Sequence, residues 1–300
     1  MSPEIETSVS WKERLLKALP KLAVGSASVL AALYVGLSPR MSPALYNKRL
    51  FRPAKYPEGE WSLDHLEGIP REDVYFCAPD GSRLHGWLFH RPNSKFIHLF
   101  SHGHSGNLTG RLSLVALLLR ANASVLIYDY RGYGHSEGRP TISGVCEDGI
   151  AAYDFLVREK GYTPAEIVLY GESLGCAITS EIAAARPCAG IVLQSGFTSL
   201  KDIGGEYMPI TRLYPHFMYP RPLLDNVKRM SMDRRPLLII HGQKDQVVPF
   251  RHAQRIFEEA AQPKMFVELP EAAHSDIWSV SPAAYVDAVK SFLESLFASQ

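Results

Sequence analysis

From about residue 72 to the C-terminus, short apolar runs alternate with longer segments of helical periodicity. The short runs are continuous and rich in β-branched or aromatic residues, which is typical of strands buried on both faces. They lie at 96–100, 125–128, 167–170, 191–193, 237–240 and 265–269. Apolar residues recur at helical spacing at 112–120, 145–159, 174–185, 251–261 and 283–297. The pattern therefore predicts one α/β domain, with a mostly parallel central sheet and helices on both faces.

Two segments depart from this alternation. Residues 74–77 and 84–89 flank the turn Pro79-Asp80-Gly81, which predicts an antiparallel hairpin at the start of the sheet. Residues 198–235 are irregular and rich in tyrosine, methionine and proline, which favours a short lid or cap. Its aromatic and methionine side chains are candidates for an acyl-binding wall, with ordinary core packing as the alternative.

Residues 1–45 form a basic N-terminal segment that contains an uncharged stretch from Leu22 to Leu37. Four basic residues precede this stretch, as in many membrane anchors. Sixteen residues in a helix reach roughly 24 Å, so the span is marginal for a hydrocarbon core of roughly 30 Å. A membrane anchor is our interpretation; a signal peptide that is cleaved on export and an amphipathic or buried helix are the alternatives. Residues 46–71 are expected to be a linker to the α/β domain over 72–300.

Composition narrows the classes of partner. Lys and Arg total 32 against 31 Asp and Glu, so the basic excess of many nucleic-acid-binding proteins is missing and no nucleic-acid partner is expected. The 22 glycines and 21 prolines are too few for a low-complexity chain. The four cysteines form no CxxC pair and have no zinc-like spacing with histidine. We expect them to be free thiols.

The motif with the strongest chemical meaning is IVLYGESLG at 167–175, in which a predicted strand runs through Gly171-Glu172-Ser173-Leu174-Gly175 into a predicted helix. G-x-S-x-G in this context places a serine on a strained turn with its Oγ exposed. A helix N-terminus directly after it favours developing negative charge. Ser173 is therefore the predicted nucleophile.

A nucleophilic serine needs a histidine base and a carboxylate, expected in the order acid then histidine on turns after later strands. Asp245 follows the strand at 237–240, and His274 follows the strand at 265–269. Asp276 and Asp233 are competing acids, but Asp276 lies too close to the histidine and Asp233 precedes its strand. We assign Asp245 and His274.

Acyl transfer also needs hydrogen-bond donors that stabilise the tetrahedral oxyanion. Backbone N–H groups serve this purpose, because they do not change their protonation state. The two candidate donors are the amides of Leu174, directly after the nucleophile, and of His104, in the turn after the strand at 96–100. His102 and His104 have no nearby carboxylate and make a poor metal site. The predicted chemistry needs neither metal nor cofactor.

The motifs HGHSGN, DYRGYGHSEG, GESLG, SGFTSL, IIHGQKDQVVP and EAAHSD, in this order, resemble those of the α/β-hydrolase superfamily over about residues 72–297. Within it, the chain most resembles small, often membrane-anchored α/β-hydrolase-domain proteins, whose relatives include protein depalmitoylases and lysophospholipid lipases. The resemblance implies the α/β-hydrolase fold and hydrolysis of esters or thioesters. It also implies the same five site residues: Ser173, Asp245, His274, and the amides of His104 and Leu174.

The first loop departs from the family pattern. Relatives usually have Asn then Ala where this chain has His104 and Ser105, so a pocket of different polarity is expected. The glycine-rich loop at 129–136 is implied to be structural, while His135 and His216 are candidates to line the substrate approach.

The sequence thus predicts a serine hydrolase for a small-molecule or lipid-like acyl ester or thioester, working through an acyl-enzyme and held at a membrane. Two alternatives from other classes stay open. One is a serine peptidase or amidase of the same fold, although such enzymes usually carry a propeller or large cap for which this chain has no room. The other is a non-catalytic anchored interaction protein, which a triad splayed apart in space would favour.

Overall fold

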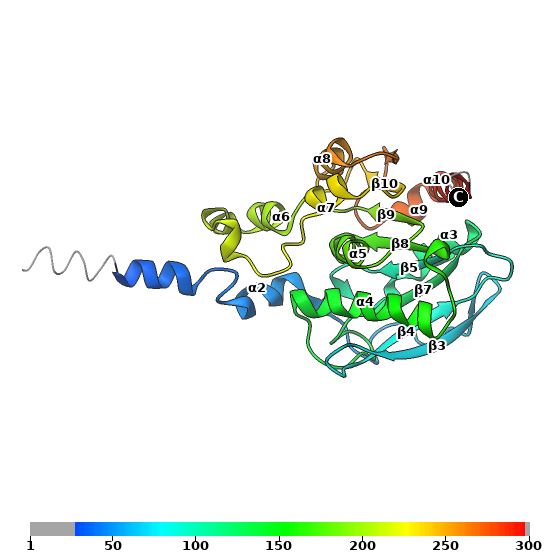
Figure 1. Ribbon diagram of the computed structural model, residues 1–300, viewed down its shortest axis with the longest axis horizontal. Coiled ribbons are helices and arrows are strands. Elements are labelled where there is room, and N and C mark those ends of the chain that lie inside the picture. Colours follow the sequence, from blue (N-terminus) through cyan, green and yellow to red (C-terminus); the bar gives the residue numbers. More distant parts are fainter. Residues whose placement is uncertain (1–27, 298–300) are drawn as a thin grey trace, which may run out of the picture.

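The computed structural model describes residues 28–297 and has a nine-stranded sheet at its centre (Figure 1). From one edge to the other the strands are β11 (Lys264–Leu269), β10 (Leu237–Gly242), β9 (Gly190–Gln194), β8 (Ile167–Glu172), β5 (Ile97–Ser101), β7 (Ser124–Asp129), β4 (Arg83–Phe89), β3 (Ile69–Cys77) and β2 (His65–Leu66). Strands β11 to β7 are parallel neighbours, whereas β4 is antiparallel to both β7 and β3. The predicted α/β class, hairpin and mostly parallel sheet are confirmed.

Helices cover both faces of the sheet. The helices α3 (Leu112–Arg120) and α10 (Pro282–Phe297) pack on one face, and α4 (Ile142–Arg158), α5 (Leu174–Ala185) and α8 (Arg251–Glu259) pack on the other. Successive side chains of a strand point to opposite faces. In β8, Ile167 and Leu169 accordingly join the core under α4 and α5, while Val168 and Tyr170 join the core under α3 and α10. A sheet buried on both faces needs continuous apolar strands, as the sequence has.

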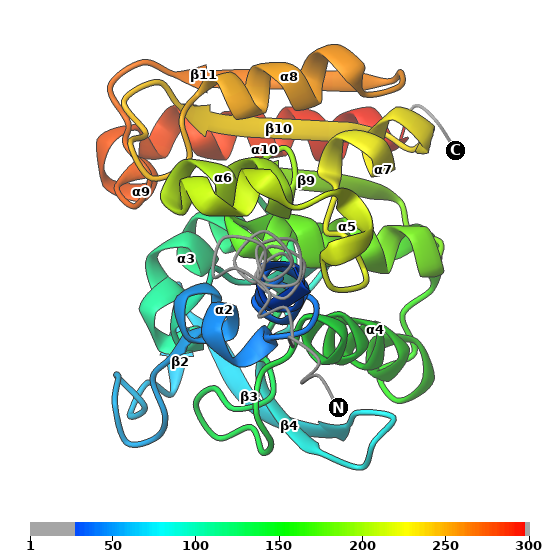
Figure 2. The same ribbon diagram turned by 90° about the vertical axis from the view of Figure 1, so that its left-hand side faces the viewer.

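Residues 198–235 leave the sheet between β9 and β10 and form a small cap. It comprises α6 (Leu200–Tyr207), two 3-10 turns (Pro209–Leu213 and His216–Met218) and α7 (Asn226–Met232). Ser199 and Asp225 pair in an antiparallel bridge, so the cap begins and ends at one place. Figures 1 and 2 place α6 on the same side of the molecule as helix α2 (Pro43–Leu50).

The structure differs from the predicted linker over residues 46–71. Helix α2 extends into this stretch, Phe51 is buried, and β1 (Arg52–Pro53) pairs in parallel with β6 (Ser105–Gly106). The partners of this segment lie far along the chain. Such long-range pairing of two-residue strands leaves no local periodicity, which is why the sequence pattern did not indicate it.

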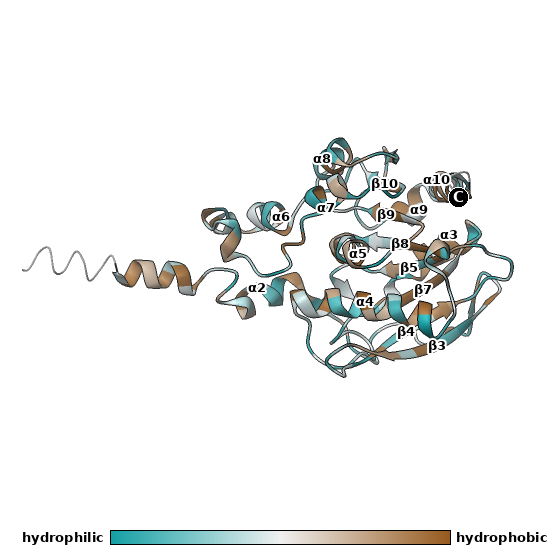
Figure 3. Ribbon diagram, in the orientation of Figure 1, coloured by the Kyte–Doolittle hydropathy of each residue, from teal (hydrophilic) through white to brown (hydrophobic). Residues whose placement is uncertain are grey.

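Residues 28–36 are helical and extend away from the rest of the molecule (Figures 1 and 3). Their apolar side chains are largely exposed; Leu30 and Leu33 are 66% and 51% accessible. Most of the predicted anchor, residues 1–27, lies outside the described residues. Within the described part of the chain, no helix combines the length and apolarity needed to cross a bilayer.

Candidate active site

Ser173 stands on a sharp turn between β8 and α5, where its backbone adopts φ +55°. Such a left-handed conformation is strained for a non-glycine residue. The flanking glycines allow the turn, because a Cβ at Gly175 would lie 1.8 Å from the carbonyl oxygen of Ser101 and one at Gly171 would lie 2.6 Å from the backbone of Cys176. The G-x-S-x-G spacing is therefore a steric requirement of the turn.

The structure brings Ser173, His274 and Asp245 into one hydrogen-bonded chain. His274 Nε2 lies 3.1 Å from Ser173 Oγ, and His274 Nδ1 lies 2.7 Å from Asp245 Oδ2. The other carboxylate oxygen of Asp245 accepts hydrogen bonds from the backbone N–H groups of Val247 and Val248, at 2.9 and 2.8 Å. An ionised Asp245 only accepts, so it places the imidazole proton on Nδ1 and leaves Nε2 free to take the serine proton.

The pKa of Asp245 reflects these contacts. Burial alone would raise its pKa, but hydrogen bonds from His241, His274 and the Val248 amide outweigh burial and hold the pKa well below its usual range. The two competing acids are used elsewhere: Asp276 accepts from the N–H of Ala273, and Asp233 pairs with Arg235.

His241 is a contributor that the sequence analysis did not assign. It is fully buried, and its Nε2 lies 3.2 Å from Asp245 Oδ2 and 2.8 Å from the carbonyl oxygen of Val248. It thereby holds the loop that carries the carboxylate. The sequence feature that could have indicated this role is its position four residues before Asp245, near the end of β10.

The backbone N–H groups of the two predicted oxyanion donors lack an acceptor for different reasons. Leu174 is the first residue of α5, so its N–H has no acceptor within the helix. His104 lies in the loop after β5, and its N–H meets no acceptor among residues 28–297. The carbonyl oxygen of His104 accepts from the Arg52 N–H at 2.9 Å and from Tyr133 Oη at 2.7 Å, which holds the peptide unit directly after this N–H. Both N–H groups are therefore unused donors beside the serine turn.

Glu172, the second residue of the G-x-S-x-G motif, joins the serine turn to this loop. Its carboxylate accepts from the Gly103 N–H at 3.0 Å and from Arg111 Nε at 2.9 Å. Burial would raise its pKa, but the Arg111 charge and these hydrogen bonds lower it. The sequence analysis gave it no role, although an acid directly before the nucleophile, at the end of a buried strand, was a usable signal.

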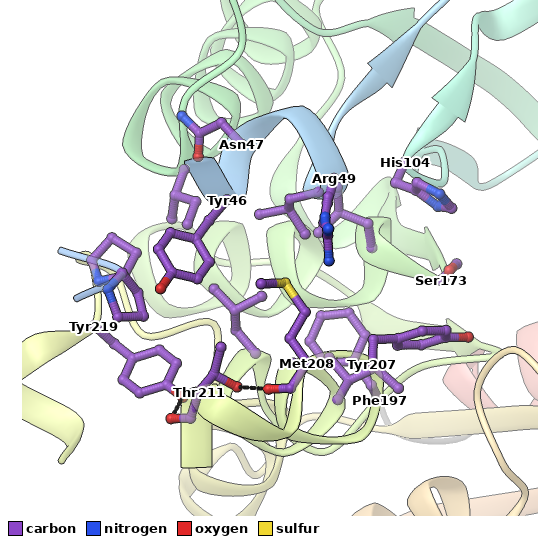
Figure 4. Close-up of a pocket in the computed structure, with 18 of the residues that line it drawn as sticks. Tyr46, Asn47, Arg49, His104, Ser173, Phe197, Tyr207, Met208, Thr211 and Tyr219 are labelled. Carbon is purple, nitrogen blue, oxygen red and sulfur yellow. Dashed lines mark hydrogen bonds between the residues drawn. The ribbon is translucent and has the colours of Figure 1, made fainter. Parts of the chain in front are cut away.

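Ser173 opens into a cavity of about 740 Å³ between the catalytic turns, α2 and the cap (Figure 4). Most of the residues that line it are apolar or aromatic: Pro39, Tyr46, Leu50, Ile142, Leu174, Phe197, Leu200, Ile203, Tyr207, Met208, Tyr219, Pro220, Val247 and Val248. Cap aromatics and Met208 thus contribute to the wall of the cavity, as expected for an acyl-binding wall, whereas Met230 belongs to the core.

His135 and His216, which the sequence analysis placed along the substrate approach, do not line this cavity. The His135 ring stacks on Tyr56, with 4.2 Å between the ring centroids.

Comparisons with known proteins identify the family of this chain. A family model described as "Serine aminopeptidase, S33" matches residues 92–222. The uncharacterized protein Rv2307c of Mycobacterium tuberculosis is 36% identical over 226 residues, which cover 74% of this chain and 78% of that protein. Alpha/beta hydrolase domain-containing protein 17C of Xenopus laevis is 30% identical over 254 residues, which cover 84% of this chain and 77% of that protein. The chain belongs to the α/β-hydrolase family.

The fold of this α/β-hydrolase also matches solved structures. The Pyrococcus furiosus esterase Pf2001 superposes with a TM-score of 0.67, over 82% of this chain and 98% of that one, at 21% identity. That level of identity speaks for the shared fold alone. Family membership makes this α/β-hydrolase a hydrolytic enzyme, and the chemistry of its substrate has to be argued from the site.

Proposed function

We propose that the protein is a serine esterase or thioesterase that hydrolyses lipid-like or acylated substrates through a Ser173–His274–Asp245 triad. One observation carries the proposal: the hydrogen-bonded chain from Asp245 to Ser173 ends at an apolar cavity of about 740 Å³. A cavity of this size lies in the range that binds small molecules, and its apolar lining suits an acyl chain.

In the proposed mechanism, Ser173 Oγ attacks the acyl carbonyl carbon while His274 Nε2 takes the hydroxyl proton. The carbonyl oxygen becomes an oxyanion that accepts hydrogen bonds from the N–H groups of His104 and Leu174. As the tetrahedral intermediate collapses, the bond to the leaving oxygen or sulfur breaks and His274 donates its proton to that atom. Water then attacks the acyl-enzyme by the same route, which releases the carboxylic acid and returns the proton to Ser173.

The test measures kcat/KM for 4-nitrophenyl esters from acetyl to palmitoyl, in detergent, for the wild type and Ser173→Ala. We expect turnover to rise with chain length and to fall at least about 10⁴-fold in the variant, because the nucleophile is lost. A fluorophosphonate probe should label the wild type and not Ser173→Ala. Optimal turnover of acetyl or butyryl esters contradicts the lipid-like substrate, and turnover that survives in Ser173→Ala contradicts the whole assignment.

An amidase or peptidase activity is the second candidate, and the match to the serine aminopeptidase model favours it. The same triad serves amides, but an amine is a poorer leaving group than an alcohol or thiol. Peptidyl 4-nitroanilides distinguish the two activities. A kcat/KM for anilides equal to or above that for esters of the same acyl group would replace the esterase proposal with the amidase one.

We further propose that the protein associates with membranes through its N-terminal apolar stretch. Leu30, Leu33 and Leu37 are each about half exposed or more, and the cap exposes apolar side chains of its own at Ile210, Leu213 and Phe217. Tyr34 links the two regions: it stacks on Tyr214 with 4.8 Å between ring centroids, and its hydroxyl donates to the carbonyl oxygen of Leu213. Burial of several such side chains in lipid stabilises membrane attachment by about 1.5 kcal/mol or more for each.

Flotation of the full chain with phosphatidylcholine vesicles tests this attachment. The double variant Leu30→Asp/Leu33→Asp should bind at least about tenfold more weakly, because two exposed apolar side chains become charged. Val280→Asp is the matched control, since Val280 is 43% exposed and belongs to α9 (Ile277–Val280), far from the N-terminal helix in Figure 1. Equal flotation of all three proteins would contradict the proposal.

A further inference from the structure

The cavity beside Ser173 has a basic side that its apolar lining leaves unexplained. Arg49, on the last turn of α2, and Arg52, in β1, both line it together with His104. Figure 4 shows the Arg49 guanidinium pointing into the cavity, across from Met208. No aspartate or glutamate of the described residues lines this cavity.

In the part of the chain that the structure describes, the two guanidinium groups also have no partner. Arginines deeper in the fold are paired, as in Arg111–Glu172 and Arg131–Asp148. Within residues 28–297, neither the Arg49 nor the Arg52 side chain forms an ion pair or a hydrogen bond. Two solvent-exposed arginines thus line a mostly apolar cavity without a counter-ion from the described chain.

The backbone holds these arginines in place. The Arg52 N–H donates to the carbonyl oxygen of His104, whose own N–H is a proposed oxyanion donor. Strand β1, which contains Arg52, also pairs with β6, the strand that directly follows His104. Phe51, between the two arginines, is buried in the core. The pKa of His104 is lowered by burial first and by the charge of Arg52 second, so the basic side lies next to the reactive centre.

A neutral substrate that fills this cavity would cover the guanidinium groups and remove part of their hydration without replacing it, which is unfavourable. An anionic substrate group replaces the lost water with charge-assisted hydrogen bonds, and the planar guanidinium fork matches the oxygens of phosphate or carboxylate. The apolar lining and the unpaired charges together therefore select for an amphiphile.

We infer that the substrate is an acyl ester or thioester whose leaving group carries an anionic group, phosphate or carboxylate, which binds Arg49 and Arg52 while the acyl chain occupies the apolar part of the cavity. This inference rests on the proposed serine hydrolase function and adds the charge of the substrate to it.

The test compares kcat/KM for octanoyl esters that differ in charge: mono-octanoylglycerol, which is neutral, octanoylglycerol phosphate and O-octanoyl glycolate. The wild type should prefer at least one anionic ester over the neutral one by at least about tenfold, because hydrogen bonds to charged groups are worth at least about that factor. The double variant Arg49→Ala/Arg52→Ala should reduce the preference to within about threefold of unity.

Two further variants separate charge from structure. Lys48→Ala removes a positive charge from the same helix at a residue that does not line the cavity, so it should keep the wild-type preference. Arg49→Lys/Arg52→Lys keeps both charges and should retain most of the preference, with melting temperatures compared for all variants.

The outcomes distinguish the two levels of the proposal. A preference for the phosphate or for the carboxylate ester that depends on the arginines supports the inference and identifies the anion. No preference, or one that survives the double alanine variant, overturns it and leaves the esterase proposal standing. If none of the octanoyl or 4-nitrophenyl esters shows Ser173-dependent turnover, the proposed function itself fails.

Discussion

One side of the cavity carries the reactive groups on turns that end β5, β8, β10 and β11, whereas the opposite side consists of α2, β1 and the cap. The backbone hydrogen bonds of neighbouring parallel strands position the first side, and its strained serine turn leaves no space for any residue but glycine at position 175. Side-chain packing, 3-10 turns and a two-residue strand pair position the second side. Under the proposed function, the C-terminal ends of the strands would determine the reaction, while the facing side would determine which acyl compound is accepted.

The largest expected effect is on the sheet side, in Asp245→Asn. Two backbone N–H groups bind Asp245 Oδ1, so the asparagine oxygen should stay there and turn its NH₂ group toward His274. That amide cannot accept the Nδ1 proton, and the imidazole takes the wrong tautomer. We expect kcat to fall about 10⁴-fold.

The control for this variant is the same change at the competing acid. Asp276→Asn keeps an oxygen that accepts from the Ala273 N–H, so its loss of kcat should be less than tenfold. Equal losses in the two variants would mean that the acid of the triad is wrongly assigned.

The second prediction concerns the contact that joins two turns of the reactive side, the serine turn after β8 and the loop after β5. Glu172→Gln leaves Arg111 charged and only 14% exposed beside a neutral amide. Removal of one member of a buried ion pair typically lowers the free energy of unfolding by about 3 kcal/mol. Urea denaturation followed by circular dichroism measures the loss.

Glu181→Gln is the matched control, because its partner Arg229 is 39% exposed and water screens the pair. We expect a loss of at most about 1 kcal/mol there. Similar losses at both sites would contradict a structural role of Glu172 in joining the serine turn to the oxyanion loop.

The smallest effect is expected on the facing side, in Met208→Trp. The larger ring should narrow the apolar part of the cavity without touching the triad (Figure 4). Each methylene that no longer fits loses about 1 kcal/mol or more, so the ratio of kcat/KM for decanoyl over acetyl esters should fall about tenfold. Ile210→Trp is the control, since Ile210 is 56% exposed and lies outside the cavity. An unchanged ratio in Met208→Trp would mean that the acyl chain binds elsewhere.

The sequence pattern predicted the fold class, and the strands it marked from β5 to β11 lie within about two residues of the observed ones. This worked because strands buried on both faces must be continuous and apolar, and because a serine turn with a left-handed backbone restricts the positions two residues before and after the serine to glycine. Each requirement is local, so it is visible in a few consecutive residues. The same logic placed Asp245 and His274 directly after their strands, and the structure has them in one hydrogen-bonded chain with Ser173.

Only the tertiary structure decided what surrounds these residues. Arg52 meets His104, Glu172 meets Arg111, and Tyr34 meets Tyr214 across separations of 52 to 180 positions, and none of these contacts follows a periodic pattern. Local sequence determines backbone conformation through sterics and hydrogen bonding, and hence the catalytic turns. The shape and charge of the cavity arise from packing between distant segments, which depends on every neighbour at once and is therefore decided only in the folded molecule.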